Sequence, residues 1–125
     1  MVNLNPQWVV SIVRNPLAVH VDFTELEGLM GKRLPSNIDM VLEHHGKFLI
    51  GEWKRENEKI SLGQQILLKQ FAKLERFTVL IIVGDTDNGM KVSKVWQLRY
   101  DESWSLVGSS TADLKEYLVQ WDKDA

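Results

Sequence analysis

Apolar residues follow a strand-like spacing in several segments of the chain. Residues 37–42 and 47–54 are rich in apolar side chains and flank a short polar connection that contains a glycine, which predicts an antiparallel hairpin. The uninterrupted apolar run at residues 78–83 predicts a strand that is buried on both faces. Residues 91–100 alternate between apolar and polar side chains, and residues 104–107 can pair with them across a short turn.

Helix-like spacing separates these strand segments. Residues 61–76 carry apolar side chains every three or four positions, which predicts an amphipathic helix. Residues 24–31 have capping residues at both ends of a short apolar pattern, and residues 110–121 begin with a capping serine, so both are expected to be helical. Residues 5–13 begin with Asn-Pro and fit a helix, although their β-branched residues also fit a strand. Together these elements predict an α/β fold with a mixed central sheet flanked by helices.

Length and composition narrow the class of protein. The 125 residues, of which 44% are hydrophobic, suit one domain, so residues 1–125 are expected to form a single folded unit. The chain has no cysteine, which excludes disulfides, thiolate metal sites and cysteine nucleophiles. We see no apolar stretch near the roughly 20 residues that span a bilayer, and no secretory signal. We therefore expect a cytoplasmic protein without a membrane partner.

The charge of the chain is unevenly distributed. The formal net charge of −2 does not favour binding to nucleic acid by charge alone. Local charge gives a different picture, because the last 25 residues hold six acidic and two basic side chains, whereas basic residues gather in the middle of the chain. This asymmetry predicts one basic face, formed by Lys54, Arg55, Lys59, Lys69, Lys73 and Arg76.

The predicted hairpin brings together side chains that suit metal-dependent hydrolysis. Glu52 and Lys54 are two residues apart on one strand, so they share a face of the sheet. The short connection places Asp39, on the preceding strand, opposite the region of Glu52. Two carboxylates and an ammonium then converge, and Mg²⁺ is typically held by one or two carboxylates together with substrate phosphate. A lysine beside such an ion can orient the attacking water.

This pattern resembles the core motif of the PD-(D/E)XK nuclease superfamily, over roughly residues 22–84. The resemblance implies a restriction-endonuclease-like core and a divalent cation, Mg²⁺ or Mn²⁺. It also implies that Asp39, Glu52 and the backbone carbonyl of Trp53 bind the metal, and that Lys54 assists the nucleophile.

The resemblance implies two further site residues, each with an alternative. Many members of the superfamily use a glutamine near the start of the following helix, which Gln64 or Gln65 supplies here, and we prefer Gln65. Several members, including archaeal Holliday-junction resolvases, have a metal-binding glutamate on the first helix. Glu25 or Glu27 supplies it in this sequence, with Glu25 as our first choice.

The function expected from the sequence is a metal-dependent deoxyribonuclease, acting as an endonuclease on DNA and compatible with a homodimer. One alternative keeps the fold without catalysis: an inactive nuclease-like module that binds nucleic acid or a protein partner. A second alternative is structural, because Glu52 and Lys54 would also fit a surface ion pair on an edge strand. His44 and His45 are expected to be exposed residues of the hairpin turn without a role in the site.

Overall fold

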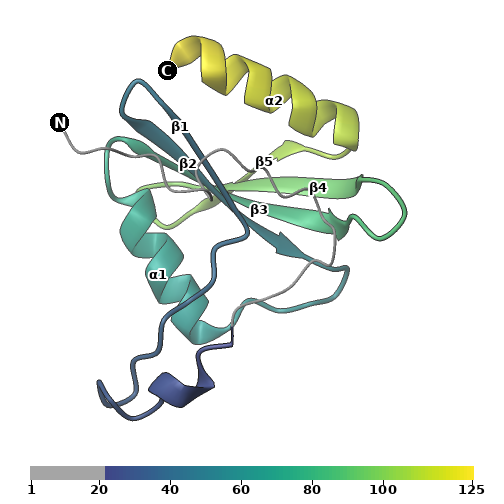
Figure 1. The fold of residues 1–125 in the computed structure, drawn as a ribbon. Coiled ribbons are helices and arrows are strands. Elements are labelled where there is room, and N and C mark those ends of the chain that lie inside the picture. The colour runs from purple at the N-terminus through teal and green to yellow at the C-terminus, as the bar shows by residue number, and fades with distance from the viewer. Residues whose placement is uncertain (1–21) are drawn as a thin grey trace, which may run out of the picture. The chain divides into compact units, whose positions relative to one another are not determined.

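The computed structural model of the chain describes residues 22–125, which fall into two compact units. The first unit ends at Asn37, and the second, Ile38–Ala125, contains all the strands and α-helices of the described chain (Figure 1). In the first unit the described residues form the 3-10 helix η2 (Thr24–Leu26), followed by short bridged turns. Each unit is described by itself below.

A mixed sheet with the order β1-β2-β3-β4-β5 forms the centre of the second unit (Figure 1). Strands β2 and β3 are parallel, and every other neighbouring pair is antiparallel. The predicted mixed sheet is therefore confirmed. The strands are β1 (Met40–His44), β2 (Lys47–Lys54), β3 (Phe77–Asp85), β4 (Lys91–Leu98) and β5 (Trp104–Gly108).

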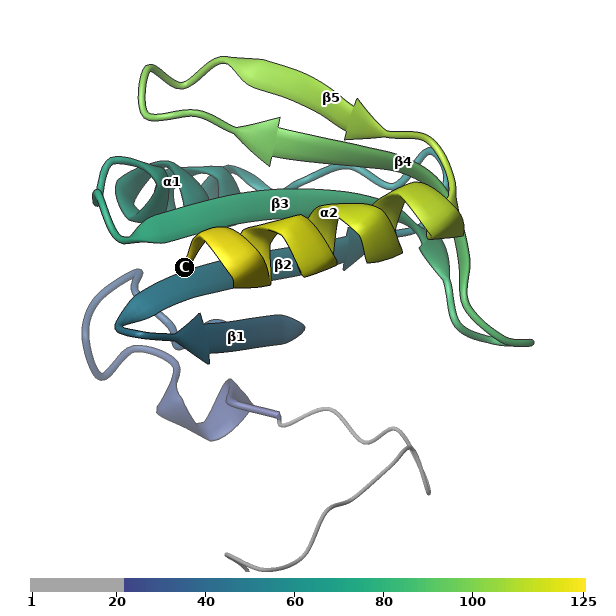
Figure 2. The same cartoon turned by 90° about the horizontal axis from the view of Figure 1, so that it is seen from above.

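Two helices cover opposite faces of this sheet (Figure 2). Helix α1 (Leu62–Ala72) is the crossover between the parallel strands β2 and β3, and α2 (Thr111–Asp124) follows β5. Serine side chains begin both helices. Ser61 accepts a hydrogen bond from the Gln64 amide, and Ser110 accepts one from the Asp113 amide, which satisfies amide groups that have no partner within the helix.

The sheet separates two apolar layers. Ile50 and Ile81 face α1, where they pack in one cluster with Leu68. Leu49 and Leu80 face the other helix, where they pack in a second cluster around α2. The residues of β3 from 79 to 82 are all buried, as the uninterrupted apolar run predicts. The two layers hold β2 and β3 in the centre of the fold, and this fixes the positions of the side chains at their ends.

Two of the expected helices differ in the structure, and a third lies outside the described residues. The helix expected over residues 24–31 is wrong, because only Thr24–Leu26 is helical and the glycines at 28 and 31 adopt positive φ angles of 81° and 69°. Helix α1 ends at Ala72 instead of residue 76, because the chain must turn there to bring β3 beside β2. The helix expected at residues 5–13 lies outside the described residues. Among helices within residues 22–125, none is both long and apolar enough to cross a membrane.

Candidate active site

The register of the hairpin places Asp39 beside Glu52. Met40, the first residue of β1, pairs with Gly51 of β2, so the next pair along the two chains is Asp39 with Glu52. The Asp39 carboxylate also accepts a hydrogen bond of 2.9 Å from the backbone amide of Trp53. The amide and the carbonyl of one strand residue point to the same neighbouring strand. The Trp53 carbonyl therefore points to the β1 side of β2, where Asp39 lies. The side chain of Trp53 packs on the opposite layer, against the α2 cluster.

Glu52 is a buried carboxylate in the interior of the sheet. It is only 4% exposed, and β2 is paired with β1 on one side and β3 on the other. Burial raises the pKa of Glu52 to about 7, and the negative charge of Asp39 and a side-chain hydrogen bond with it contribute in the same direction. The positive charge of Lys54 lowers the pKa by less than these effects raise it. The alternative of a surface ion pair on an edge strand is therefore wrong.

Gln64 connects the acidic and basic parts of the site. Its amide oxygen accepts a hydrogen bond of 2.8 Å from the Lys54 ammonium, and its amide nitrogen lies 3.4 Å from a carboxylate oxygen of Glu52. Gln64 lies in the first turn of α1, where its backbone amide is held by the capping hydroxyl of Ser61 at 3.2 Å. The cap thus fixes the position from which the Gln64 side chain reaches both charged groups.

Gln65, the residue preferred from the sequence, does not reach these groups. Its side-chain amide donates a hydrogen bond of 3.2 Å to the carbonyl of Ile60, in the loop before the helix. The spacing of residues along α1 could have indicated Gln64 instead of Gln65. Gln64 is four residues before Leu68, which is 2% exposed and faces the sheet, so Gln64 lies on the same inward stripe of α1.

Lys54 lies at the end of β2 with its side chain only 11% exposed. Besides its hydrogen bond to Gln64, its ammonium is 3.9 Å from a carboxylate oxygen of Glu58. The other carboxylate oxygen of Glu58 accepts a hydrogen bond of 2.9 Å from the Arg55 amide, so Glu58 is tied to the loop that follows β2. Sequence reasoning missed Glu58, because it lies in that loop, where no periodic pattern indicates a direction for the side chain.

The remaining predicted metal ligands lie in the first unit. Glu25 is part of η2, Glu27 directly follows it, and both side chains are exposed. In the part of the chain that the structure describes, no group of three or more His, Cys, Asp or Glu side chains gathers at one point. The second unit contributes two carboxylates, Asp39 and Glu52, with the carbonyl of Trp53 at the same edge. These are oxygen donors, which suit a hard cation that keeps several of its waters.

The two histidines of the hairpin turn have structural partners. The rings of His44 and His45 are stacked with centroids 4.0 Å apart. The Nδ1 atom of His44 is 3.0 Å from the backbone oxygen of Asp122, and that of His45 is 3.3 Å from the oxygen of Ala125. These contacts connect the turn between β1 and β2 to the end of α2, at the opposite end of β2 from Glu52 and Lys54.

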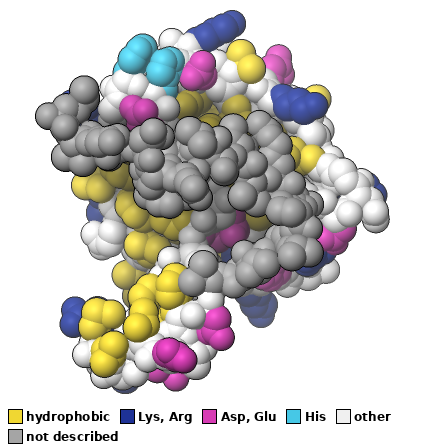
Figure 3. Space-filling model, viewed as in Figure 1, with side chains coloured by type: hydrophobic (Ala, Val, Ile, Leu, Met, Phe, Trp, Pro, Cys, Tyr) yellow, Lys and Arg dark blue, Asp and Glu magenta, His cyan; other side chains and the backbone are white. Residues whose placement is uncertain are grey.

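The predicted basic face is interrupted by ion pairs. The guanidinium of Arg55 binds both carboxylate oxygens of Asp87, at 2.7 and 2.9 Å, and the ammonium of Lys69 is 3.6 Å from a carboxylate oxygen of Glu102. On the side of the molecule that Figure 3 shows, the coloured Lys and Arg side chains lie apart from one another. Three of the six residues of the predicted basic face are therefore paired with carboxylates, Lys54 among them.

Comparisons with protein-family models, curated proteins and solved structures found no match. The function of the site is therefore inferred from its own geometry and chemistry.

Proposed function

We propose that this chain is a metal-dependent DNA endonuclease, with a restriction-endonuclease-like core and a divalent-cation site at Asp39 and Glu52. The observation that supports this most strongly is the burial of Glu52 beside Asp39, with a pKa raised to about 7. Glutamine has nearly the same shape and would avoid the cost of a buried negative charge. A bound divalent cation would offset that cost, which gives a physical reason for a carboxylate at this position.

The topology around the site supports the proposal. Strands β1 and β2 form the hairpin, α1 crosses over, and β3 pairs in parallel with β2. In open α/β sheets, ligands bind beyond the carboxyl ends of such strands. Glu52 and Lys54 are in the last three residues of β2, next to the start of α1. This arrangement supports the proposal of a restriction-endonuclease-like core.

Each residue of the site has a role in this proposal. Asp39 and Glu52 hold the cation, Mg²⁺ or Mn²⁺, together with the Trp53 carbonyl. When bound, the cation supplies positive charge that stabilises the phosphate and makes water more acidic. The Lys54 ammonium, fixed by the amide oxygen of Gln64, donates a hydrogen bond to the nucleophilic water or to a phosphate oxygen. Gln64 is a positioning residue, because it orients Lys54 and Glu52.

The second candidate is a nuclease-like module without catalysis, which binds nucleic acid or a protein partner. One observation favours it: the described residues offer two carboxylates at the site but no third metal-binding side chain. Such a module has no reason to need a divalent cation. Metal dependence therefore separates the two candidates.

A cleavage assay on a panel of substrates tests the proposal. Linear duplex, nicked, single-stranded and four-way DNA, with RNA as a further substrate, are incubated with Mg²⁺ or Mn²⁺. We expect metal-dependent cleavage that falls by about a hundredfold or more in Asp39→Asn and Lys54→Met. Asp87→Asn is the matched control, because it removes a carboxylate that pairs with Arg55 outside the site, and it should keep activity.

Two outcomes would contradict the proposal. The first is a wild-type protein that cleaves none of the substrates with either metal. The second is a pair of folded variants, Asp39→Asn and Lys54→Met, that cleave as fast as the wild type. Circular dichroism of each variant shows whether it is folded.

A further inference from the structure

Helix α1 leaves part of its own face of the sheet uncovered. Trp96 of β4 packs against the α1 cluster and is paired with Leu106 of β5, while Leu98 is paired with Trp104. Paired residues on antiparallel strands point to the same face, so Trp104 and Leu106 lie on the α1 face as well. Helix α1 packs mainly against β3 and β4, and Trp104 and Leu106 of β5 remain 39% and 53% exposed.

A pocket of about 370 Å³ lies on this uncovered part of the face and reaches the site. Its volume is at the small end of the range for ligand pockets, about 300–1,000 Å³. Its lining is mostly apolar, and the two charged residues in it, Lys54 and Glu58, belong to the site region described above. The apolar lining consists of Ile60, Ile81, Val83, Trp96 and Trp104.

The lining matches the chemistry of a nucleobase attached to a phosphate. Two indole rings beside aliphatic side chains suit a flat aromatic group, and bases of single-stranded nucleic acid commonly stack on aromatic side chains. Lys54 lines the same pocket and supplies the positive charge that a phosphate next to that base requires. An aliphatic partner would bury the indoles equally well but would make no use of the positive charge of Lys54 in the lining.

We propose that the pocket formed by Trp96 and Trp104 holds an unstacked nucleobase next to the phosphodiester bound at the Asp39, Glu52 and Lys54 site. This inference rests on the proposed nuclease function and specifies its substrate. In a duplex, neighbouring bases cover both faces of each base, so a base must be unpaired or flipped to enter the pocket. The substrate class is therefore single-stranded DNA, or DNA with an unpaired nucleotide at the cleavage position.

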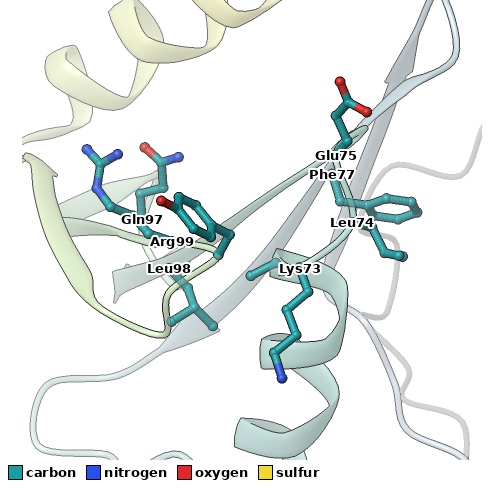
Figure 4. A pocket seen from close by; sticks show the side chains of 9 residues that line it. Lys73, Leu74, Glu75, Phe77, Gln97, Leu98 and Arg99 are labelled. Atoms are coloured by element: carbon teal, nitrogen blue, oxygen red, sulfur yellow. The ribbon is translucent and has the colours of Figure 1, made fainter.

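Binding of a short single-stranded oligonucleotide, measured by fluorescence anisotropy in EDTA, tests the role of Trp104. Loss of one stacked base corresponds to a roughly fivefold to 150-fold increase in Kd, which we expect for Trp104→Ala. Trp104→Phe keeps an aromatic ring and should restore most of the affinity. Tyr100→Ala is the control, because Tyr100 is 76% exposed. It lines a different pocket, of about 390 Å³, beside the C-terminal end of α1 and the start of β3 (Figure 4).

Nuclear magnetic resonance locates the base directly. The five tryptophan indole N–H signals are assigned with single Trp→Phe variants, and deoxynucleoside monophosphates are titrated into the full-length protein. We expect concentration-dependent shifts of the Trp96 and Trp104 signals, with Trp121, which packs against the opposite face of the sheet, unchanged. Shifts absent from Trp96 and Trp104 at saturating nucleotide would overturn the proposal.

The outcomes separate this inference from the nuclease function on which it rests. Cleavage of DNA with equal Kd for wild type and Trp104→Ala would leave the nuclease function standing and overturn the base pocket. Nucleotide-dependent indole shifts without cleavage would support the pocket and contradict catalysis. If Trp104→Ala abolishes self-association in sedimentation velocity and leaves oligonucleotide binding unchanged, the pocket is an interface between copies of the chain and the proposal is wrong.

Discussion

Replacing Glu52 by glutamine tests how much stability the buried carboxylate costs the metal-free protein. Glutamine preserves the shape of the side chain and can donate a hydrogen bond to Asp39. It cannot ionise, so the cost of placing a negative charge in the sheet interior disappears. We therefore expect Glu52→Gln to be more stable than the wild type above neutral pH, and less active.

The size and the pH dependence of this effect follow from the pKa of Glu52. Its pKa rises from 4.5 to about 7 on folding, and each tenfold change in proton affinity is worth about 1.4 kcal/mol, so the full effect is about 3 kcal/mol. Because the folded state holds this proton more tightly, the wild type loses stability as the pH rises from about 4.5 to about 7. Above that range the loss is complete, and below it the loss is absent.

Urea denaturation in EDTA, followed by circular dichroism at several pH values from 4 to 8.5, measures the difference. Urea lowers the free energy of unfolding of small proteins by about 1–3 kcal/mol per molar, so 3 kcal/mol moves the midpoint by about 1–3 M. We expect Glu52→Gln to have the higher midpoint at pH 8, with the gap closing at pH 4. Glu116→Gln, an exposed position on α2, is the control and should change stability by less than about 0.5 kcal/mol.

A constant difference between wild type and Glu52→Gln across the pH range would refute this reasoning. It would show that Glu52 does not titrate differently in the folded and unfolded states. A variant that is less stable than the wild type at pH 8 would also refute it, because the ionised carboxylate would then be favourable in the metal-free fold.

Further predictions concern the positioning residue and the backbone. Gln64→Leu should lower kcat by about tenfold or more with little change in KM, because the Lys54 ammonium loses its hydrogen bond to the Gln64 amide oxygen. Gln65→Leu should keep kcat within about threefold in the same steady-state assay. Gly84→Ala should lower the free energy of unfolding by at least about 1 kcal/mol in urea denaturation, because an added Cβ would overlap the backbone carbonyl of Lys91. Gly63→Ala, in the first turn of α1 with open space around it, should instead stabilise by up to about 1 kcal/mol. Equal activity of the two glutamine variants, or a neutral Gly84→Ala, would contradict these expectations.

The fold could be predicted where periodicity was strong. The continuous apolar run of β3 requires cover on both faces, and the structure provides it with α1 and α2. The hairpin was also predictable, but its turn is shorter than the expected connection of residues 43–46. Strand β1 extends to His44, which pairs with Lys47, and this register brings Asp39 next to Glu52. Residues 24–31 misled the prediction, since capping residues at both ends do not make a helix without enough apolar surface to pack.

The site was less predictable than the fold, because its details depend on contacts between elements. Sequence spacing placed Glu52 and Lys54 on one face, but the choice of Gln64 over Gln65 depends on how α1 is rotated against the sheet. Glu58 lies in an irregular loop, and its approach to Lys54 follows from the path of that loop. The pocket at Trp104 depends on α1 leaving β5 uncovered, a property of helix placement that no local pattern encodes.

Isothermal titration of Mn²⁺ into the metal-free protein, in buffers of different ionisation enthalpy, tests most directly whether Asp39 and Glu52 form a cation site. A cation that binds Glu52 must displace the proton that this carboxyl holds below about pH 7. We expect binding that releases close to one proton at pH 6 and little at pH 8.5, and that is lost in Asp39→Asn. The absence of Mn²⁺ binding, or binding that is unchanged in Asp39→Asn, would contradict the proposed site.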